Sequence, residues 1–151
     1  MPRIDPELRR TLVADAAVGR LATVTAAGRP HIVPCCFVLA ADGGSGRDAI
    51  YSVVDGKPKS TMALKRLDNI RANPAASLVV DRYDDDWSQL WWVRVDGDAS
   101  VLDAGEESAA AVELLAAKYH QYRETPPTGE VLRVEVTDWS DWTASVFDAR
   151  L

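Results

Sequence analysis

The stretch that decides the fold is LWWVRVDGDASVL, residues 90–102. Its apolar and polar side chains alternate with the two-residue period of a strand, which predicts one buried face and one polar face. The predicted buried face carries Trp91, Val93, Val95, Ala99 and Val101. Gly97 interrupts the pattern and predicts a bulge or a bend. Because a strand with one polar face is typical of antiparallel sheets, we expect an antiparallel fold.

Further strands and helices are predicted on both sides of this stretch. Strands are expected at residues 20–25, 31–40, 49–54, 76–83, 131–139 and 142–147, with a short turn between the last two. Helices are expected at residues 5–17, from Ser60 or Thr61 to residue 72, and at residues 106–122, where Asp103 and Glu106 have capping-box spacing. Residues 31–40 are apolar on both faces, which predicts a central strand. Few strands are joined by crossover helices, so the order favours a mainly-β (α+β) antiparallel barrel with peripheral helices.

Length and composition indicate a single acidic domain. The chain has 151 residues, and 17 bases against 23 acids give a net charge of −6. An acidic surface argues against nucleic acids and anionic membranes as partners. No apolar run approaches the roughly 18 residues that span a bilayer, and the first residues lack a signal-peptide pattern. The only cysteines, Cys35 and Cys36, are adjacent, which excludes a disulfide scaffold and predicts a reducing, cytoplasmic setting.

One segment departs from this acidic character. Residues 57–73 hold five bases against one acid, a local charge of 5 − 1 = +4, so the rest of the chain carries −6 − 4 = −10. The bases are Lys57, Lys59, Lys65, Arg66 and Arg71. Basic side chains beside the N-terminal half of a helix predict a site for a phosphate, with a solvated helix face as the alternative. The segment has neither Walker-loop spacing nor a GxGxxG motif.

Side chains for acid–base or metal chemistry are scarce. His31 and His120 are the only histidines, and no spacing relates them, so we expect both to be structural or exposed. No metal-binding motif is present. An enzyme with so few reactive groups is expected to rely on an organic cofactor. Trp91 and Trp92 must face opposite sides of their strand, and the outward one predicts a subunit interface or an aromatic cofactor pocket, with ordinary packing as the alternative.

Four stretches resemble the motifs of a known family. They are VGRLAT (18–23), GRPHIVP (28–34), KPK (57–59) with LKRLDNIRANP (64–74), and DWSQLWWVRVDG (86–97). The chain resembles, over nearly its whole length, the pyridoxamine-phosphate-oxidase-like flavin-binding split β-barrels. Within them it is most similar to the branch that uses the deazaflavin coenzyme F420. The resemblance implies a split barrel and a homodimer with two cofactor sites at the subunit interface.

The resemblance also implies roles for particular residues. Lys65 and Arg66 match the basic pair that holds the cofactor phosphate. Lys57 and Lys59, in the loop before them, would suit the phosphate and the polyglutamate tail of the deazaflavin. The residues implied to line the cofactor ring are Val33, Pro34, Cys35 and Ser52, with Trp87 or Trp92 of the partner subunit closing the pocket.

The implied activity is hydride transfer between this cofactor and a small unsaturated organic substrate, without a dedicated catalytic side chain. Two alternatives stay open. One is an oxidoreductase of the same fold that uses flavin mononucleotide (FMN), and the other is a non-catalytic carrier of the cofactor.

Overall fold

Seven strands and four α-helices make up the part of the chain that this computed structural model describes, residues 3–41, 46–54 and 61–145, with the backbone alone for 61–64. The helices are α1 (Pro6–Asp15), α2 (Thr61–Ala72), α3 (Glu106–Lys118) and α4 (His120–Glu124), with a 3-10 turn, η1, at Trp87–Gln89. The strands are β1 (Gly19–Val24), β2 (Pro30–Cys35), β3 (Val38–Ala40), β4 (Ala49–Val53), β5 (Ala75–Arg82), β6 (Trp91–Val101) and β7 (Val131–Thr143).

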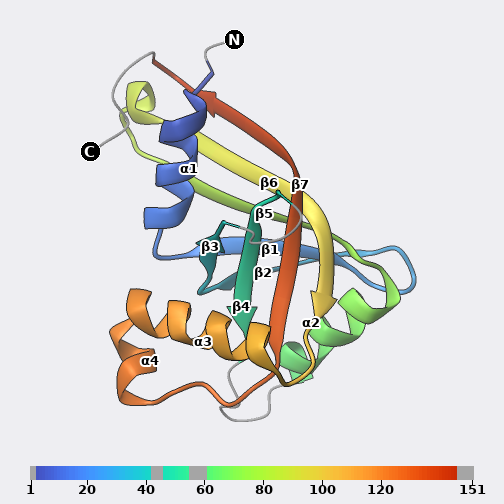
Figure 1. Cartoon of the computed structure of the whole chain (residues 1–151). Coiled ribbons are helices and arrows are strands. Elements are labelled where there is room, and N and C mark those ends of the chain that lie inside the picture. Colours follow the sequence, from blue (N-terminus) through green and yellow to red (C-terminus); the bar gives the residue numbers. More distant parts are fainter. Residues whose placement is uncertain (1–2, 42–45, 55–60, 146–151) are drawn as a thin grey trace.

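The strand order forces the sheet to curl. The order is β2-β1-β5-β6-β7-β4-β3, with antiparallel neighbours, yet the two edge strands are separated in sequence only by Cys36 and Phe37. Seven flat strands would place the edges about 29 Å apart, whereas three Cα–Cα steps reach at most about 11 Å. The sheet therefore curls until its two edges come near each other without pairing, which confirms the predicted antiparallel split barrel, and the helices lie around it (Figure 1).

The hydrophobic core fills the inside of this barrel. Its most buried members alternate along the strands, as the period of two requires, and include Leu21, Ile50, Leu78, Val93, Val95, Leu132 and Val134. Leu115 of α3 packs on the outer side of the sheet against Val53 and Val131. Strand β4 is consequently buried on both faces, whereas β6 has the single buried face that its sequence predicts.

The prediction of one central strand at residues 31–40 is wrong. The segment forms two short strands, β2 and β3, and they are the edges of the sheet. The chain breaks at Phe37, because its backbone N–H donates to the Tyr119 hydroxyl (3.0 Å) and its carbonyl accepts from Lys118 Nζ (2.9 Å). The apolar outer face of β2 suggested a central position, but it is exposed to solvent in the single chain, where Ile32 is 66% exposed.

The prediction of two closing strands at residues 131–139 and 142–147 is also wrong. A single strand, β7, runs through Thr143 and pairs with β6 along its length. Asp96 lies opposite Asp138 and Gly97 opposite Val136, so Thr137 is the extra residue of a bulge. This bulge confirms the irregularity predicted at Gly97, and it lets the long strand bend without a turn.

The predicted helix at residues 106–122 is divided. Helix α3 ends at Lys118 because Tyr119 takes an extended conformation, and α4 begins at His120. Gly105 is the N-cap, and its N–H donates to the Ser108 hydroxyl at 3.1 Å, so the predicted capping box is displaced along the chain. Among the described residues, no helix has the length and apolar character needed to cross a membrane.

Candidate functional site

Helix α2 is fixed beside β1 by a buried hydrogen bond. Asn69 Nδ2 donates to Thr23 Oγ1 at 3.2 Å, and both residues are nearly inaccessible to solvent. Leu67 and Ile70 are buried in the core on the same helix, and Arg71 forms an ion pair of 3.0 Å with Glu130. Residues three apart share a helix face, so these contacts turn Arg66 toward the sheet as well. Lys65 is exposed.

Three of the predicted site residues come together next to this helix. Ser52 is 3% exposed and donates its hydroxyl to the Cys36 carbonyl at 2.7 Å, which ties β4 to the connection between β2 and β3. Burial raises the pKa of the Cys35 thiol, and the nearby charge of Arg66 and the hydrogen bond with Ser52 partly oppose this rise. Cys35, Ser52 and Arg66 are therefore neighbours across β2, β4 and α2.

Two polar nitrogens in this region are shielded from solvent. Arg66 Nε and His31 Nδ1 have no hydrogen-bond partner within the part of the chain that the structure describes. His31 lies opposite Thr23 in the β1–β2 register, and Thr23 is bonded to Asn69 of α2. We call the group His31, Cys35, Ser52, Arg66 and Asn69 the α2–β2 cluster. Since buried polar groups normally have partners, these nitrogens are candidates for contact with a bound polar group.

The predicted ring-lining segment of β2 is divided between two faces. His31, Val33 and Cys35 are half-buried and lie on the inner side, opposite Thr23, Leu21 and Gly19 in the register with β1. Pro34 is exposed and lies on the outer side with Ile32. Val33 therefore lies on the same face of β2 as the cluster members His31 and Cys35, whereas Pro34 lies on the other face.

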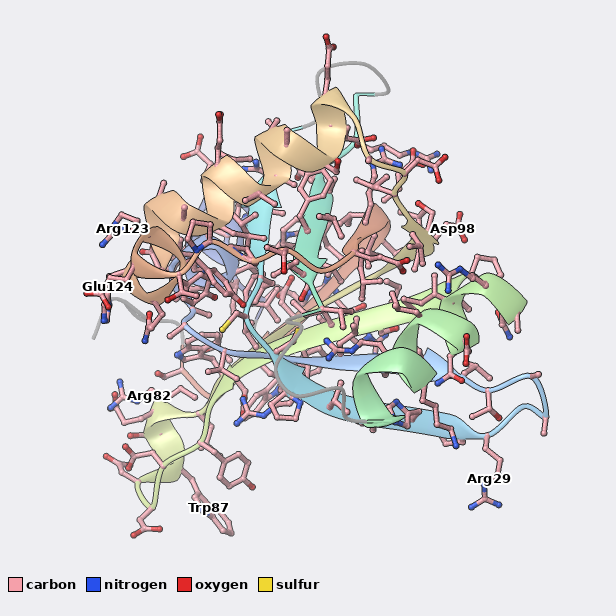
Figure 2. All side chains as sticks on the ribbon, turned by 90° about the horizontal axis from the view of Figure 1, so that it is seen from below. Arg29, Arg82, Trp87, Asp98, Arg123 and Glu124 are labelled. Atoms are coloured by element: carbon pink, nitrogen blue, oxygen red, sulfur yellow. The ribbon has the colours of Figure 1, made fainter. Side chains whose placement is uncertain are left out.

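The two tryptophans of the prediction lie far from this cluster within one chain. Trp92 pairs with Trp142 and, on the other side, with Asp81, and it lines an apolar cavity of about 280 Å³. Helix α2 lies near the far end of β6, where Ile70 lines a cavity together with Ala99, about 23 Å along the strand from Trp92. Trp87 is 73% exposed, and Figure 2 shows it at the opposite end of the molecule from Arg29 in the β1–β2 turn.

Lys57 and Lys59 lie outside the described residues, so their predicted roles stay predictions. Sequence analysis did not assign a role in this region to three residues that the structure places there: His31, Asn69 and Tyr119. The alternation along β2 was a usable signal for His31, because it places the imidazole on the face of Val33 and Cys35. Among the described residues, no cluster of three or more acidic, histidine or cysteine side chains is placed to hold a metal ion.

The end of α3 holds the seam of the barrel, where β2 gives way to β3. Besides its bond from Phe37, the Tyr119 hydroxyl lies 2.9 Å from the Ala17 carbonyl, and burial raises its pKa to about 12. Lys118 Nζ lies 4.0 Å from the centre of the Phe37 ring, and burial lowers its pKa. The connection that carries Cys36 is thus fixed from α3 and from Ser52 of β4.

The fold and the composition of the cluster define a split-barrel protein of the α+β class. A comparison with family models identifies the class more closely: the pyridoxamine 5'-phosphate oxidase model matches residues 4–143. The chain therefore belongs to the pyridoxamine 5'-phosphate oxidase family. A comparison with curated proteins gave no match.

Solved structures of similar fold cover nearly the whole chain. A conserved protein of unknown function from Corynebacterium diphtheriae has a TM-score of 0.66 at 22% identity, covering 93% of this chain and 94% of its own. An FAD-binding protein from Mesorhizobium loti has a TM-score of 0.66 at 19% identity, covering 93% and 95%. The heme storage protein HutZ from Vibrio cholerae has a TM-score of 0.65 at 16% identity, covering 94% and 95%. At these identities the similarity concerns the fold alone.

Proposed function

We propose that this protein is an oxidoreductase that binds a flavin-type cofactor, specifically the deazaflavin coenzyme F420, and acts on a small unsaturated organic substrate. The observation that carries the proposal is the α2–β2 cluster, in which Arg66 offers a shielded N–H without a partner among the described residues. Family membership supports a flavin-type ligand, and so does the FAD-binding relative of similar fold. The concentrated positive charge of residues 57–73 supports an anionic cofactor such as F420.

In this proposal the residues of the chain bind and orient the cofactor. Arg66 would hold the phosphate with Lys65, because a guanidinium presents several donors to phosphate oxygens. Val33, Cys35 and Ser52 would border the ring. The bound deazaflavin would supply hydride-transfer chemistry, and the apolar surroundings would exclude water from it. The burial of Cys35 and its raised pKa favour the neutral thiol as a packing group.

We also propose a homodimer with the cofactor sites at its interface. Several large apolar side chains are exposed in the single chain, with relative exposures of 66% for Ile32, 80% for Tyr83 and 73% for Trp87. Exposed apolar groups of this size favour a protein interface. Trp87 and Trp92 lie away from α2 of their own chain, so in this proposal they would contact the cofactor held by a partner. A stable monomer at micromolar concentration in sedimentation would contradict this arrangement.

The test is a titration of F420 and of FMN against wild-type protein, Arg66→Ala and Lys65→Ala/Arg66→Ala. Loss of charge-assisted hydrogen bonds to phosphate should weaken the preferred cofactor by roughly 2–4 kcal/mol in the double variant, about 30- to 900-fold in Kd. Arg71→Ala is the matched control, because it removes one base from the same helix at a residue that pairs with Glu130. Equal affinities in the wild type and the double variant would contradict the phosphate assignment.

Two alternatives have separate support. An FMN-dependent oxidoreductase is favoured by the FAD-binding relative, and it predicts a protein that is yellow as purified and turns over with oxygen. A non-catalytic carrier is favoured by the heme storage protein of similar fold. Tight cofactor binding without hydride transfer to a panel of unsaturated acceptors would support the carrier.

A further inference from the structure

We infer that His31 is a second cofactor contact, which binds a neutral polar group of the cofactor while Arg66 binds the phosphate. The inference rests on the proposed function. Its starting observation is that His31 Nδ1 is shielded from solvent and lacks a partner among the described residues. A buried imidazole nitrogen left without a hydrogen bond costs stability, so a native protein normally provides a partner for it.

The contacts of α2 place the two unpartnered nitrogens along the same strand. Asn69 is bonded to Thr23, which lies directly opposite His31 in the β1–β2 register. Arg66 lies about one helical turn before Asn69, and its positive charge lowers the pKa of the Cys35 thiol at the other end of β2. Asn69 is therefore placed near the His31 end of β2, and the charge of Arg66 is close enough to the Cys35 end to influence its thiol.

The inner face of β2 between these ends carries one apolar side chain. Val33 lies on the same face as His31 and Cys35, because residues two apart share a face of a strand. The sequence of groups along this face is thus imidazole, valine and thiol, with the guanidinium reaching in from α2. Such a surface matches a ligand with an apolar, planar part and polar groups at separate positions.

The chemistry of the two nitrogens assigns them different polar groups. Arg66 carries a permanent charge and a planar set of donors, which suits a phosphate. His31 offers the nitrogen Nδ1, which is a donor or an acceptor according to the tautomer of the imidazole. A single nitrogen of this kind suits one neutral carbonyl, imide or hydroxyl group. Flavins and deazaflavins carry such groups on the ring and its side chain, so His31 would position the ring-bearing part of the cofactor.

The experiment separates the two contacts by removing the phosphate from the ligand. FMN is compared with riboflavin, and F420 with its phosphate-free deazaflavin, in titrations against wild type, His31→Leu, His31→Asn and Arg66→Ala. His31→Leu should weaken the phosphate-bearing and phosphate-free ligands alike, by about 3- to 10-fold for one neutral hydrogen bond. His31→Asn keeps a polar atom near Nδ1 and should recover part of this loss. Arg66→Ala should weaken only the phosphate-bearing ligands.

A second measurement is made on the wild-type protein and needs a variant only at the exposed His120, for assignment. The chain contains only two histidines, so their imidazole nitrogen resonances can be assigned with the His120→Asn variant. Cofactor binding should shift the Nδ1 resonance of His31 and leave exposed His120 unchanged. Unchanged His31 resonances, together with equal affinities of wild type and His31→Leu, would overturn the inference even if Arg66→Ala weakens binding. Absence of any binding to the wild type would overturn the proposed function itself.

Discussion

Asp141 is predicted to be the strongest single anchor between the N-terminal segment and the barrel. Its side chain has no solvent exposure and lies opposite Val93 on the inner side of β7. It accepts hydrogen bonds from the Ile4 N–H at 2.7 Å, from Arg3 Nε at 3.1 Å and from Arg9 at 3.0 Å. Asp141→Asn keeps the shape and one acceptor oxygen but removes the charge that both arginines need.

The contacts set the expected size of the effect. A hydrogen bond to a charged group contributes about 1.5–3 kcal/mol when buried. Arg9 is 22% exposed and lies over the Trp139 ring, so its contact with Asp141 should count nearly in full. Arg3 is 62% exposed, so solvent screening should keep the contribution of its ion pair with Asp141 below about 1 kcal/mol. The variant should lose about 2–3 kcal/mol of unfolding free energy, equivalent to a decrease of roughly 5–10 °C in Tm.

The effect should depend on pH in a defined direction. Burial alone would raise the pKa of Asp141, but the hydrogen bonds from Ile4, Arg9 and Arg3 outweigh burial and hold this pKa below its usual range. A depressed folded-state pKa stabilises the protein above the unfolded value of about 3.9, and this contribution disappears as the pH falls through the folded value. The difference between wild type and Asp141→Asn should therefore be full at neutral pH and shrink below about pH 4.

Urea unfolding followed by circular dichroism, between neutral pH and the lowest pH at which the wild type stays folded, measures this difference. Asp85→Asn is the control, because it removes the same charge from an exposed loop position and should change the unfolding free energy by less than about 0.5 kcal/mol. A loss below about 0.5 kcal/mol for Asp141→Asn at neutral pH would refute the anchoring argument. A larger loss that stays constant as the pH falls below the unfolded pKa of about 3.9 would refute its electrostatic origin.

Two further predictions concern the bulge and the seam. Gly97→Ala should cost about 3 kcal/mol or more in urea unfolding, because the added Cβ would lie 2.0 Å from a backbone oxygen of β7. The Cβ of Gly105→Ala meets nothing within 4 Å, so this control should cost at most about 1 kcal/mol, the difference between glycine and alanine at a helix N-cap; similar losses in both would contradict the steric argument. Tyr119→Phe should cost about 1–2 kcal/mol at neutral pH, because it removes the hydroxyl that receives the Phe37 N–H. The pKa of Tyr119 is raised to about 12, so its contribution is complete below the unfolded value of about 10 and is lost as the pH rises toward 12; a wild-type advantage that does not shrink over this range would contradict the assignment.

Local sequence signals correctly predicted those features of the fold that depend on a regular residue spacing or on adjacent residues. The alternation of β6 gave its buried face correctly, because every second residue meets the same barrel interior. The end of α2 was also predictable, since Asn73 precedes a proline and the helix stops at Ala72. These features depend on neighbours within a few residues.

The errors occur where contacts with residues distant in sequence determine the backbone conformation. The break at Phe37 depends on Lys118 and Tyr119, which are 81 and 82 residues away in sequence. The apolar pattern of residues 31–40 could not reveal whether the outer face of β2 is covered by another strand or remains open in the single chain. For the site, the charge of Arg66 was visible in the sequence, whereas the buried position of His31 depends on the packing of α2 through Asn69 and Thr23.

The position of the candidate site follows from the way in which the barrel closes. Among the described strands, β2 pairs only with β1 and β3 only with β4, so the curled sheet has a seam between its edges. Side chains on the inner face at a seam lack the continuous neighbours that surround the rest of the core, which explains why His31 lies there without a partner among the described residues. Helix α2 covers this part of the barrel and brings Arg66 to it. The same gap that leaves the sheet open therefore provides both an apolar surface and unpaired polar atoms, the two properties that a flat, anionic cofactor requires.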